Sequence, residues 1–374
     1  MRAGVPEAGG PRDGEATMRR VIGLMSGTSL DGVDAALIET DGERIASFGT
    51  ALTIPYDPAL RTALRGLLDR AAHIDATDPE LLRLERRLTD VHVAAVAALG
   101  EPAALIGFHG QTILHRPAEG RTWQIGDAAY LAHRTGLPVA YDFRSADVAA
   151  GGEGAPLVPA YHAALAAGLE RPVAFLNLGG VANLTWIGPD DAPDTLLACD
   201  TGPGNALLDD WAMRHTGIPC DTDGRLAASG RVDEGVLARL LAHPFFSRPA
   251  PKSLDRLQFH EALDTVSGLS AADGAATLTA FTAASIAMTI LAERPKRWLV
   301  CGGGRRNPVL MQALRDRLHA PVDPVETLGW DGDALEAQCF AFLAARVEAG
   351  RPLSWPGTTG VPVPTLGGRL IRPS

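Results

Sequence analysis

Short apolar runs near the start of the chain alternate with turns and predict neighbouring strands. Val21-Ile22 and residues 33–38 are apolar, and the residues between them are mostly small or carry hydroxyl groups. A second turn at Asp41-Gly42 leads to a third predicted strand over residues 44–54. Strands joined by such short turns pair side by side, so the pattern predicts an antiparallel meander.

Leucines at helical spacing predict that helices follow this meander. Asp57-Pro58 precedes a segment with leucines on one side, and residues 79–99 carry apolar side chains three and four positions apart. Further helices are predicted over residues 128–135, 159–162, 206–215, 232–242, 273–293, 309–318 and 333–348. Further strands are predicted over residues 103–108, 122–127, 138–141, 173–178, 181–186, 195–199 and 297–301. The proline-rich residues 352–366 predict an extended tail.

The strand–turn–strand pattern of the first meander occurs a second time. Residues 173–178 and 181–186 flank Gly179-Gly180, about 150 residues after the first pair. This repetition, and a length of 374 residues, predict a duplicated core with a cleft between two domains. We expect a disordered extension over residues 1–18, an N-terminal domain over 19–170 and a C-terminal domain over 171–374.

Composition and charge exclude several classes of protein. The formal charge of −10 argues against a nucleic-acid partner. The four cysteines form no CxxC pair and the ten histidines show no HxxxH spacing, so neither a disulfide framework nor a zinc site is expected. No apolar run approaches the ~18 residues of a membrane span. Residues 1–18 lack the apolar region of a signal peptide, and we expect a cytoplasmic protein.

The turn at residues 26–32 has the composition of an anion-binding loop. Its glycines allow close backbone approach, and clustered N–H groups can bind a phosphate. Asp31 and Asp34 add carboxylates that could hold magnesium directly or through water. A Walker loop would need Lys where Val33 stands, and a dinucleotide fingerprint would need a helix where a strand follows. The alternative, an ordinary hairpin turn, stays open on these residues alone.

Polar residues follow several predicted strands and predict a small-molecule site. They form the pairs His109/Gln111, Gln124/Asp127 and Asp142/Arg144. Such convergence favours recognition of a polar, hydroxyl-rich or carboxylated molecule. A hydrogen-bonded structural histidine is the alternative for His109.

Two later glycine-rich segments complete the set of candidate loops. Asp200 follows a predicted strand and precedes Gly202 and Asn205, while residues 302–304 are three glycines between a strand and a helix. Three glycines at such a junction let a flat or phosphorylated ligand lie against the backbone. For Asp200, the cap of the following helix is the alternative to a role in chemistry.

Together these loops resemble those of the actin-like, sugar-kinase superfamily. Residues 27–34 resemble its first phosphate loop, 177–183 its second phosphate loop and 301–307 its adenosine loop. Within it, the chain is similar to the anhydro-N-acetylmuramic acid kinase family over about residues 20–370. The motifs that carry this similarity are residues 24–32, 110–112, 124–126, 142–144, 147–152, 154–159 and 202–205. Phe108 stands where serine is expected, and Thr201 where cysteine also occurs.

The resemblance implies an α/β fold with two actin-like (ribonuclease H-like) domains and a nucleotide cleft between them. It implies an enzyme that uses ATP and Mg²⁺ to open the 1,6-anhydro ring of anhydro-N-acetylmuramic acid with water and to phosphorylate O6. It also implies a homodimer without nucleic-acid or membrane partners. Asp200 is the expected catalytic base, and Asp31 and Asp34 the expected magnesium ligands, directly or through water.

The resemblance assigns binding roles to the loops and to the polar strand ends. The expected ATP-binding residues are Gly27, Thr28, Ser29, Leu30, Asp31, Gly32, Val33, Asp34, Gly179, Gly180, Asn183, Gly302, Gly303, Gly304 and Asn307. The expected sugar-binding residues are His109, Gln111, Gln124, Asp127, Asp142, Arg144, Gly202, Asn205 and Glu336. An actin-like ATPase acting as a regulatory or scaffold subunit and a kinase for another small sugar are the alternatives. The polar strand ends argue against a scaffold, which needs no small-molecule pocket.

Overall fold

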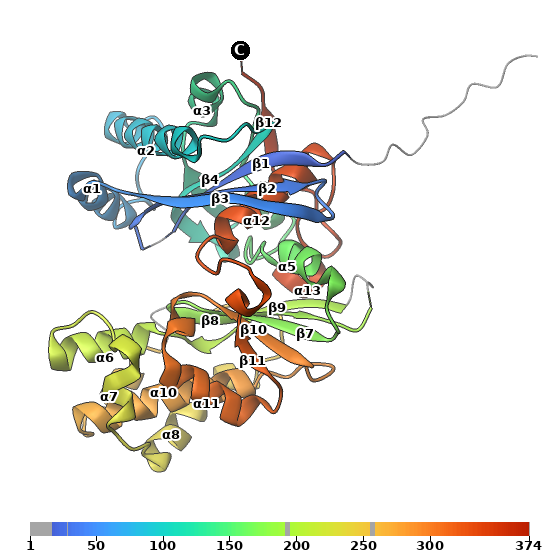
Figure 1. The fold of residues 1–374 in the computed structure, drawn as a ribbon. Coiled ribbons are helices and arrows are strands. Elements are labelled where there is room, and N and C mark those ends of the chain that lie inside the picture. Colours follow the sequence, from blue (N-terminus) through green and yellow to red (C-terminus); the bar gives the residue numbers. More distant parts are fainter. Residues whose placement is uncertain (1–16, 28, 191–194, 255–258, 374) are drawn as a thin grey trace, which may run out of the picture.

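Two β-sheets, one above the other in Figure 1, form the frame of the protein. The computed structural model describes residues 17–27, 29–190, 195–254 and 259–373. Thr28 and residues 1–16 of the predicted extension lie outside the described residues.

The first sheet has the strand order β12-β6-β4-β1-β2-β3, and β5 pairs with β4. The strands β1, β2 and β3 form the predicted antiparallel meander, whereas β4 runs parallel to β1 and β6 parallel to β4. The strands of this sheet are β1 (Arg19–Ser26), β2 (Gly32–Thr40), β3 (Ile45–Pro55), β4 (Leu105–Arg116), β5 (Arg121–Ile125), β6 (Val139–Tyr141) and β12 (Arg369–Ile371).

The second sheet repeats this connectivity in the order β11-β10-β7-β8-β9. Its first three strands are an antiparallel meander, and β10 and β11 then add in parallel. The prediction of a duplicated core is therefore confirmed, and the fold is α/β with two actin-like (ribonuclease H-like) sheets. The strands are β7 (Val173–Leu178), β8 (Val181–Ile187), β9 (Leu196–Pro203), β10 (Arg297–Cys301) and β11 (Val322–Pro324).

Helices cover the outer faces of both sheets and fill the space between them (Figure 1). The outer face of the first sheet packs on α1 (Pro58–Leu68), α2 (Pro79–Leu99) and α3 (Ala128–Thr135). The second sheet packs on α10 (Ala271–Ala287) and α11 (Pro308–Leu318). A further apolar cluster joins α10 to α6 (Ala206–Thr216), α7 (Arg225–Ala228), α8 (Glu234–Leu241) and α9 (Ala262–Thr265). The remaining helices are α4 (Ser145–Ala149), α5 (Pro159–Leu165), α12 (Leu335–Glu348) and α13 (Pro356–Thr359).

Most predicted elements are confirmed, some with ends that differ by one to three residues, and four predictions differ more. The strand predicted over 103–108 continues as β4 to Arg116, and the strand predicted over 195–199 continues as β9 through Asp200 to Pro203. Each gains backbone hydrogen bonds from its hairpin partner, β5 or β8, which outweigh the polar side chains that suggested an end. The helix predicted over 273–293 ends at Ala287, and the predicted tail contains α13.

The C-terminal segment returns to the first sheet. Helix α12 packs on β1, β2 and β4, and β12 pairs antiparallel with β6. The domain boundary at residue 171 stays a prediction, but residues 335–348 and 369–371 lie with the first sheet although they were assigned to the second domain. A long connection of this kind is invisible to local sequence patterns.

Helix α12 lies unusually close to the first sheet because two glycines face it. A Cβ atom on Gly23 would lie 1.7 Å from the carbonyl oxygen of Ala337, and one on Gly107 would lie 2.0 Å from that of Phe340. Backbone therefore contacts backbone, and neither position has room for any side chain. The other face of α12 contributes to an apolar cluster that also contains Phe175 and Leu299 of the second sheet.

Among the described residues, none of the helices combines the length and the apolar character needed to cross a lipid bilayer.

We expect Gly23→Ala to destabilise the fold, because the added methyl group overlaps the α12 backbone, which cannot move without disturbing both sheets. Overpacking of this kind costs roughly 1–3 kcal/mol or more in the free energy of unfolding, measurable by urea titration. Gly66→Ala is the control, because nothing lies within 4 Å of its added Cβ and it sits in the exposed part of α1. Equal unfolding free energies for Gly23→Ala and the parent would contradict the close packing.

Candidate active site

Two adjoining cavities between the sheets bring several predicted residues together. Both are lined by Ala155, Pro156 and Asn183, so they form one cleft. The larger, of about 370 Å³, contains Asp200. The smaller, of about 170 Å³, contains Arg144 and Glu336 with Met25, Asn177 and Phe340.

The backbone and side chain of Asp200 are both held by the segment that follows α8. The Asp200 N–H donates to the carbonyl of Lys252 (2.9 Å), and its Oδ2 accepts from the N–H of Leu254 (2.7 Å). Helix α6 begins after Asn205, and Asp200 lies within β9. The helix-cap alternative for Asp200 is therefore wrong.

The environment of Asp200 strengthens it as a base. Burial raises the pKa of its carboxyl to about 6, the Leu254 N–H opposes this shift, and the Glu153 carboxylate adds to it. A carboxylate with a pKa near 6 is ionised at neutral pH and accepts a proton more readily than an ordinary aspartate. Its environment suits general-base catalysis.

Arg144 is fixed in the cleft by a pair of hydrogen bonds to a neutral histidine. Its Nε and Nη2 lie 3.1 and 3.0 Å from Nε2 of His109, and its Nη1 donates to the carbonyl of Gly154 (2.8 Å). His109 Nδ1 donates to the carbonyl of Gly110 (2.8 Å), which leaves Nε2 as the acceptor. Burial and the Arg144 charge hold the pKa of His109 well below its usual value. His109 is thus buried and holds Arg144 in place.

Glu336 projects from the first turn of α12 into the smaller cavity. It keeps solvent contact, but the walls of the cleft surround it, and this partial desolvation raises the pKa of its carboxyl. The nearby Asp34 carboxylate raises the pKa further, and the Arg144 charge opposes both effects. The cleft thus carries several acidic groups around one arginine.

The first glycine loop is anchored by a buried glutamine. Ser26 Oγ donates to Oε1 of Gln111 (2.5 Å), and Gln111 Nε2 donates to the carbonyl of Gly27 (3.2 Å). Gln111 is completely buried, so it supports this loop instead of facing an open cavity. Leu30, at the other end of the loop, is buried in the core of the first sheet.

The glycines of the three loops fall into two groups. Gly32, Gly302 and Gly304 have no room for a Cβ, because protein atoms lie within 2.7 Å of that position. Around Gly27, Gly179, Gly180 and Gly303, the nearest contacts to an added Cβ are 3.4 Å or longer. The first group is explained by packing. The second group leaves the backbone open, as a loop that contacts a ligand requires.

The second and third loops lie against each other. A Cβ on Gly302 would lie 2.2 Å from Oδ1 of Asn177, and one on Gly304 would lie 2.7 Å from Oδ1 of Asn205. Asn205 also donates to the carbonyl of Leu178 (2.8 Å), so it belongs to this junction between loops. Asn307 caps α11, because its side chain accepts hydrogen bonds from the N–H groups of Val309 and Leu310.

The predicted magnesium ligands differ in their partners. Asp31 is exposed and pairs with Arg61 (2.8 Å). Asp34 accepts from the Thr53 hydroxyl (2.6 Å), and burial followed by the Asp333 and Asp31 charges raises the pKa of its carboxyl. Among the described residues, no group of three or more acidic, histidine or cysteine side chains could hold a metal.

Of the nine predicted sugar-binding residues, only Arg144 and Glu336 line the cavities around Asp200. The other seven do not, namely His109, Gln111, Gln124, Asp127, Asp142, Gly202 and Asn205. Gln124 and Asp142 line a separate cavity of about 240 Å³, where Asp142 also pairs with Arg369 (3.1 Å). Asp127 caps α3 and pairs with Arg86 (3.0 Å). The polar residues at the ends of β5 and β6 therefore do not line the cleft that contains Asp200.

Sequence reasoning missed several residues of the larger cavity, among them Glu153, Lys252 and Ser253. The Ser253 hydroxyl donates to Oε2 of Glu153 (3.4 Å) across the cleft. Lys252 donates to the carbonyl of Phe245 (3.1 Å), and burial lowers its pKa. The glycines around Glu153 signalled a loop, but no local pattern shows which side chains face Asp200.

The Asp200 pKa predicts a change of stability with pH. Because the folded-state pKa (about 6) exceeds the unfolded-state value, folding favours the protonated form, and this stability is lost as pH rises through 6. Asp200→Asn avoids this loss, because its side chain carries no charge. Above pH 7 we therefore expect its free energy of unfolding, measured by urea titration, to exceed that of the parent by up to ~3 kcal/mol. The gain should vanish near pH 4.

Asp273→Asn is the control of opposite sign, because hydrogen bonds from the Arg231 N–H and the Ser270 hydroxyl lower the pKa of Asp273. Its free energy of unfolding should not rise above pH 7. An Asp200→Asn variant that is less stable than the parent at pH 8 would contradict the raised pKa.

Known proteins are similar to this chain along almost its whole length. Residues 19–372 match the family model described as anhydro-N-acetylmuramic acid kinase. The anhydro-N-acetylmuramic acid kinase of Acidiphilium cryptum (strain JF-5) is 62% identical over 353 residues, 94% of this chain and 98% of the relative. That of Gluconobacter oxydans (strain 621H) is 60% identical over 358 residues, 94% of this chain and 99% of the relative.

Similarity to solved structures is more distant. A ROK family glucokinase from Streptomyces griseus, in complex with glucose and AMPPNP, matches 87% of this chain and 99% of its own, with a TM-score of 0.41 and 18% identity. A ligand-bound xylulose kinase from Lactobacillus acidophilus matches 95% of this chain and 94% of its own, with a TM-score of 0.45 and 9% identity. Similarities this low carry no argument about the site.

The family suggested by the sequence motifs is confirmed by the family model and by relatives that are more than half identical. The chain belongs to the anhydro-N-acetylmuramic acid kinase family.

Proposed function

We propose that this protein uses ATP to convert 1,6-anhydro-N-acetylmuramic acid into N-acetylmuramic acid 6-phosphate and ADP. Family membership supports the substrate and the type of reaction. The observation that carries the assignment of the site is the buried Asp200, with a pKa raised to about 6, in a cavity that also contacts Asn183 beside the second glycine loop. A base and a nucleotide loop then meet in one cleft.

In this proposal, Asp200 removes a proton from a water molecule that attacks C1 of the sugar. The C1–O6 bond breaks, and its electron pair remains on O6. O6 then forms a bond to the γ-phosphorus of ATP while the bond between that phosphorus and the bridging oxygen of ADP breaks. General-base assistance of this kind contributes about 10²–10⁴ to a rate.

Arg144 and Glu336 supply complementary groups for the sugar in the smaller cavity. Arg144 is held in place by His109 and Gly154, so its remaining N–H groups can bind an anionic or carbonyl oxygen of the substrate without reorganisation. Glu336 can accept hydrogen bonds from hydroxyl or amide groups. The sugar would contact Gln124, Asp127 or Asp142 only if its binding site extended beyond the two cavities around Asp200.

The nucleotide is assigned to the three glycine loops. Gly27, Gly179, Gly180 and Gly303 leave space for ATP to approach the backbone, and Gly32, Gly302 and Gly304 shape the loops. Asp34 would hold a hydrated Mg²⁺, with Asp31 adding negative charge nearby. The ion, when bound, screens the phosphate charges during transfer. We further propose a cytoplasmic homodimer.

A coupled ADP-release assay should show sugar-dependent turnover with 1,6-anhydro-N-acetylmuramic acid, and little with N-acetylmuramic acid or N-acetylglucosamine. The rate should increase as pH rises through about 6, because Asp200 must be ionised to act as the base. Asp200→Asn should reduce turnover by about 10²–10⁴ while the affinity for ATP stays close to that of the parent.

Three results would contradict this proposal. ADP release that is independent of any sugar would favour the alternative of a regulatory or scaffold ATPase. Preferred turnover of N-acetylglucosamine would favour a kinase for another sugar. Turnover of Asp200→Asn within a few-fold of the parent would exclude Asp200 as the base.

A further inference from the structure

The chain passes from the second sheet back to the first through a short segment that precedes α12. The strand β11 belongs to the second sheet and the 3-10 helix Val325–Leu328 packs on β10 of that sheet, whereas α12 packs on the first. Residues 329–334 make this crossing. Their position therefore affects how α12, and Glu336 on its first turn, stand relative to the second sheet.

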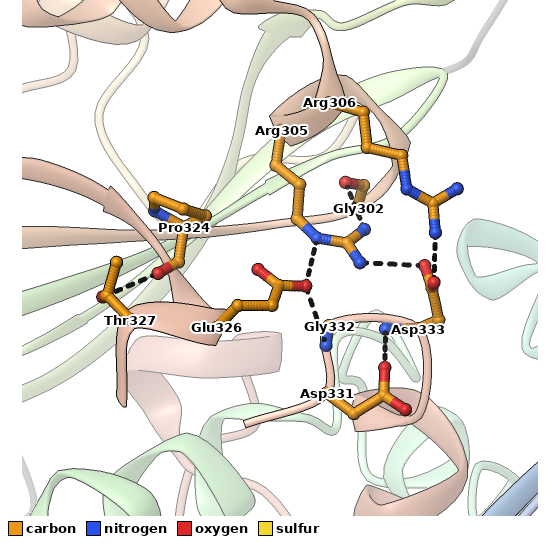
Figure 2. A network of polar contacts seen from close by, with 9 residues as sticks. All are labelled: Gly302, Arg305, Arg306, Pro324, Glu326, Thr327, Asp331, Gly332 and Asp333. Atoms are coloured by element: carbon orange, nitrogen blue, oxygen red, sulfur yellow. Dashed lines mark hydrogen bonds and ion pairs between the residues drawn. The ribbon is translucent and has the colours of Figure 1, made fainter. Parts of the chain in front are cut away.

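Arg305 of the third glycine loop is the buried anchor of this crossing, and its neighbour Arg306 also pairs with Asp333 (Figure 2). Arg305 Nε pairs with Oε1 of Glu326 (2.7 Å), and its Nη2 pairs with Oδ1 of Asp333 (3.1 Å). Its Nη1 donates to the carbonyl of Gly302 (3.0 Å). Only 6% of the Arg305 side chain is exposed, whereas the side chains of Glu326 and Asp333 keep solvent contact. We call Arg305, Glu326 and Asp333 the Arg305 bridge.

The crossing segment is fitted closely to the guanidinium of Arg305. A Cβ on Gly332 would lie 2.7 Å from Arg305 Nε and 2.8 Å from its Cζ. The Gly332 N–H also donates to Oε1 of Glu326 (3.3 Å), the oxygen that Arg305 holds. A displacement of Arg305 would consequently disturb the crossing segment directly.

The two ends of the bridge reach the two proposed ligand sites. Arg305 lies two residues after Gly303, the glycine of the third loop that has open space around it. Asp333 lies three residues before Glu336, which lines the cavity with Arg144. Asp333 also raises the pKa of Asp34, so its charge acts on the last residue of the first glycine loop.

We propose that Arg305 is a positioning residue that couples nucleotide binding at the third loop to sugar binding beside Glu336. The inference rests on the proposed function for the identity of the two ligands. A nucleotide that orders residues 302–306 fixes Arg305, and through Asp333 it fixes the start of α12. By linkage, each ligand then tightens the binding of the other by the same factor.

Calorimetry can measure this factor without turnover, with ADP and 1,6-anhydro-N-acetylmuramic acid as the two ligands. The Kd of each ligand is determined alone and with the other at saturation. For the parent we expect each ligand to tighten the other by roughly five-fold or more. For Arg305→Met and Asp333→Asn we expect the Kd of each ligand alone to change little and the factor to fall towards one.

Arg297→Met is the matched control, because it removes an arginine pair that stays within the second sheet. Arg297 pairs with Asp323 (2.8 Å), and both belong to neighbouring strands β10 and β11. This variant should keep the coupling factor of the parent. If Arg305→Met fails to fold, Asp333→Asn, which changes an exposed carboxylate, still provides the test.

The outcomes separate this inference from the proposed function. A parent that binds both ligands, with coupling that survives in folded Arg305→Met or Asp333→Asn, overturns the role of the bridge alone. If the parent binds both ligands but neither tightens the binding of the other, the role of the bridge is also overturned and the proposed function is not. A parent that does not bind ADP or the anhydro sugar overturns both proposals.

Discussion

The contact of α12 with the first sheet is the constraint on which the arrangement of the cleft depends. Gly23 and Gly107 bring the backbone of the helix against β1 and β4, and the opposite face of α12 packs towards the second sheet. Because dense packing of this kind cannot slide freely, the helix fixes the position of its first turn. Glu336 is therefore presented to the cleft by the packing of the core.

Electrostatics in the cleft oppose stability and favour chemistry. Asp34, Asp200 and Glu336 all have raised pKa values, mainly because partial or full desolvation disfavours their charged forms, and Arg144 and Lys252 are cations among the lining residues of the cleft. Such groups raise the free energy of the protein without ligands, and they favour the binding of ligands that compensate their charge. Under the proposed function, magnesium and a bound sugar would replace the missing solvent around these carboxylates.

The sequence predicts elements well where local patterns decide them. Helix α2 has the predicted bounds, because an aspartate cap, a proline and the Gly100 end signal frame its leucine repeat. The limits of β4 and β9 were wrong, because hairpin partners extend both strands past polar residues. Asp200 and Arg144 were found in the cleft, but Asp127 serves as a cap, and Glu153 and Lys252 were missed. Tertiary contact, which no local pattern contains, decides these cases.

Under the proposed function, one cleft opens the anhydro ring with water and transfers phosphate to the released oxygen. The reaction can be run with ATP and 1,6-anhydro-N-acetylmuramic acid in ¹⁸O water and analysed by mass spectrometry. A blank of unlabelled product measures exchange at the reducing end. We expect one label on the C1 oxygen of the sugar 6-phosphate and none in its phosphate. Label in free phosphate, or a 6-phosphate product without label above the blank, would contradict it.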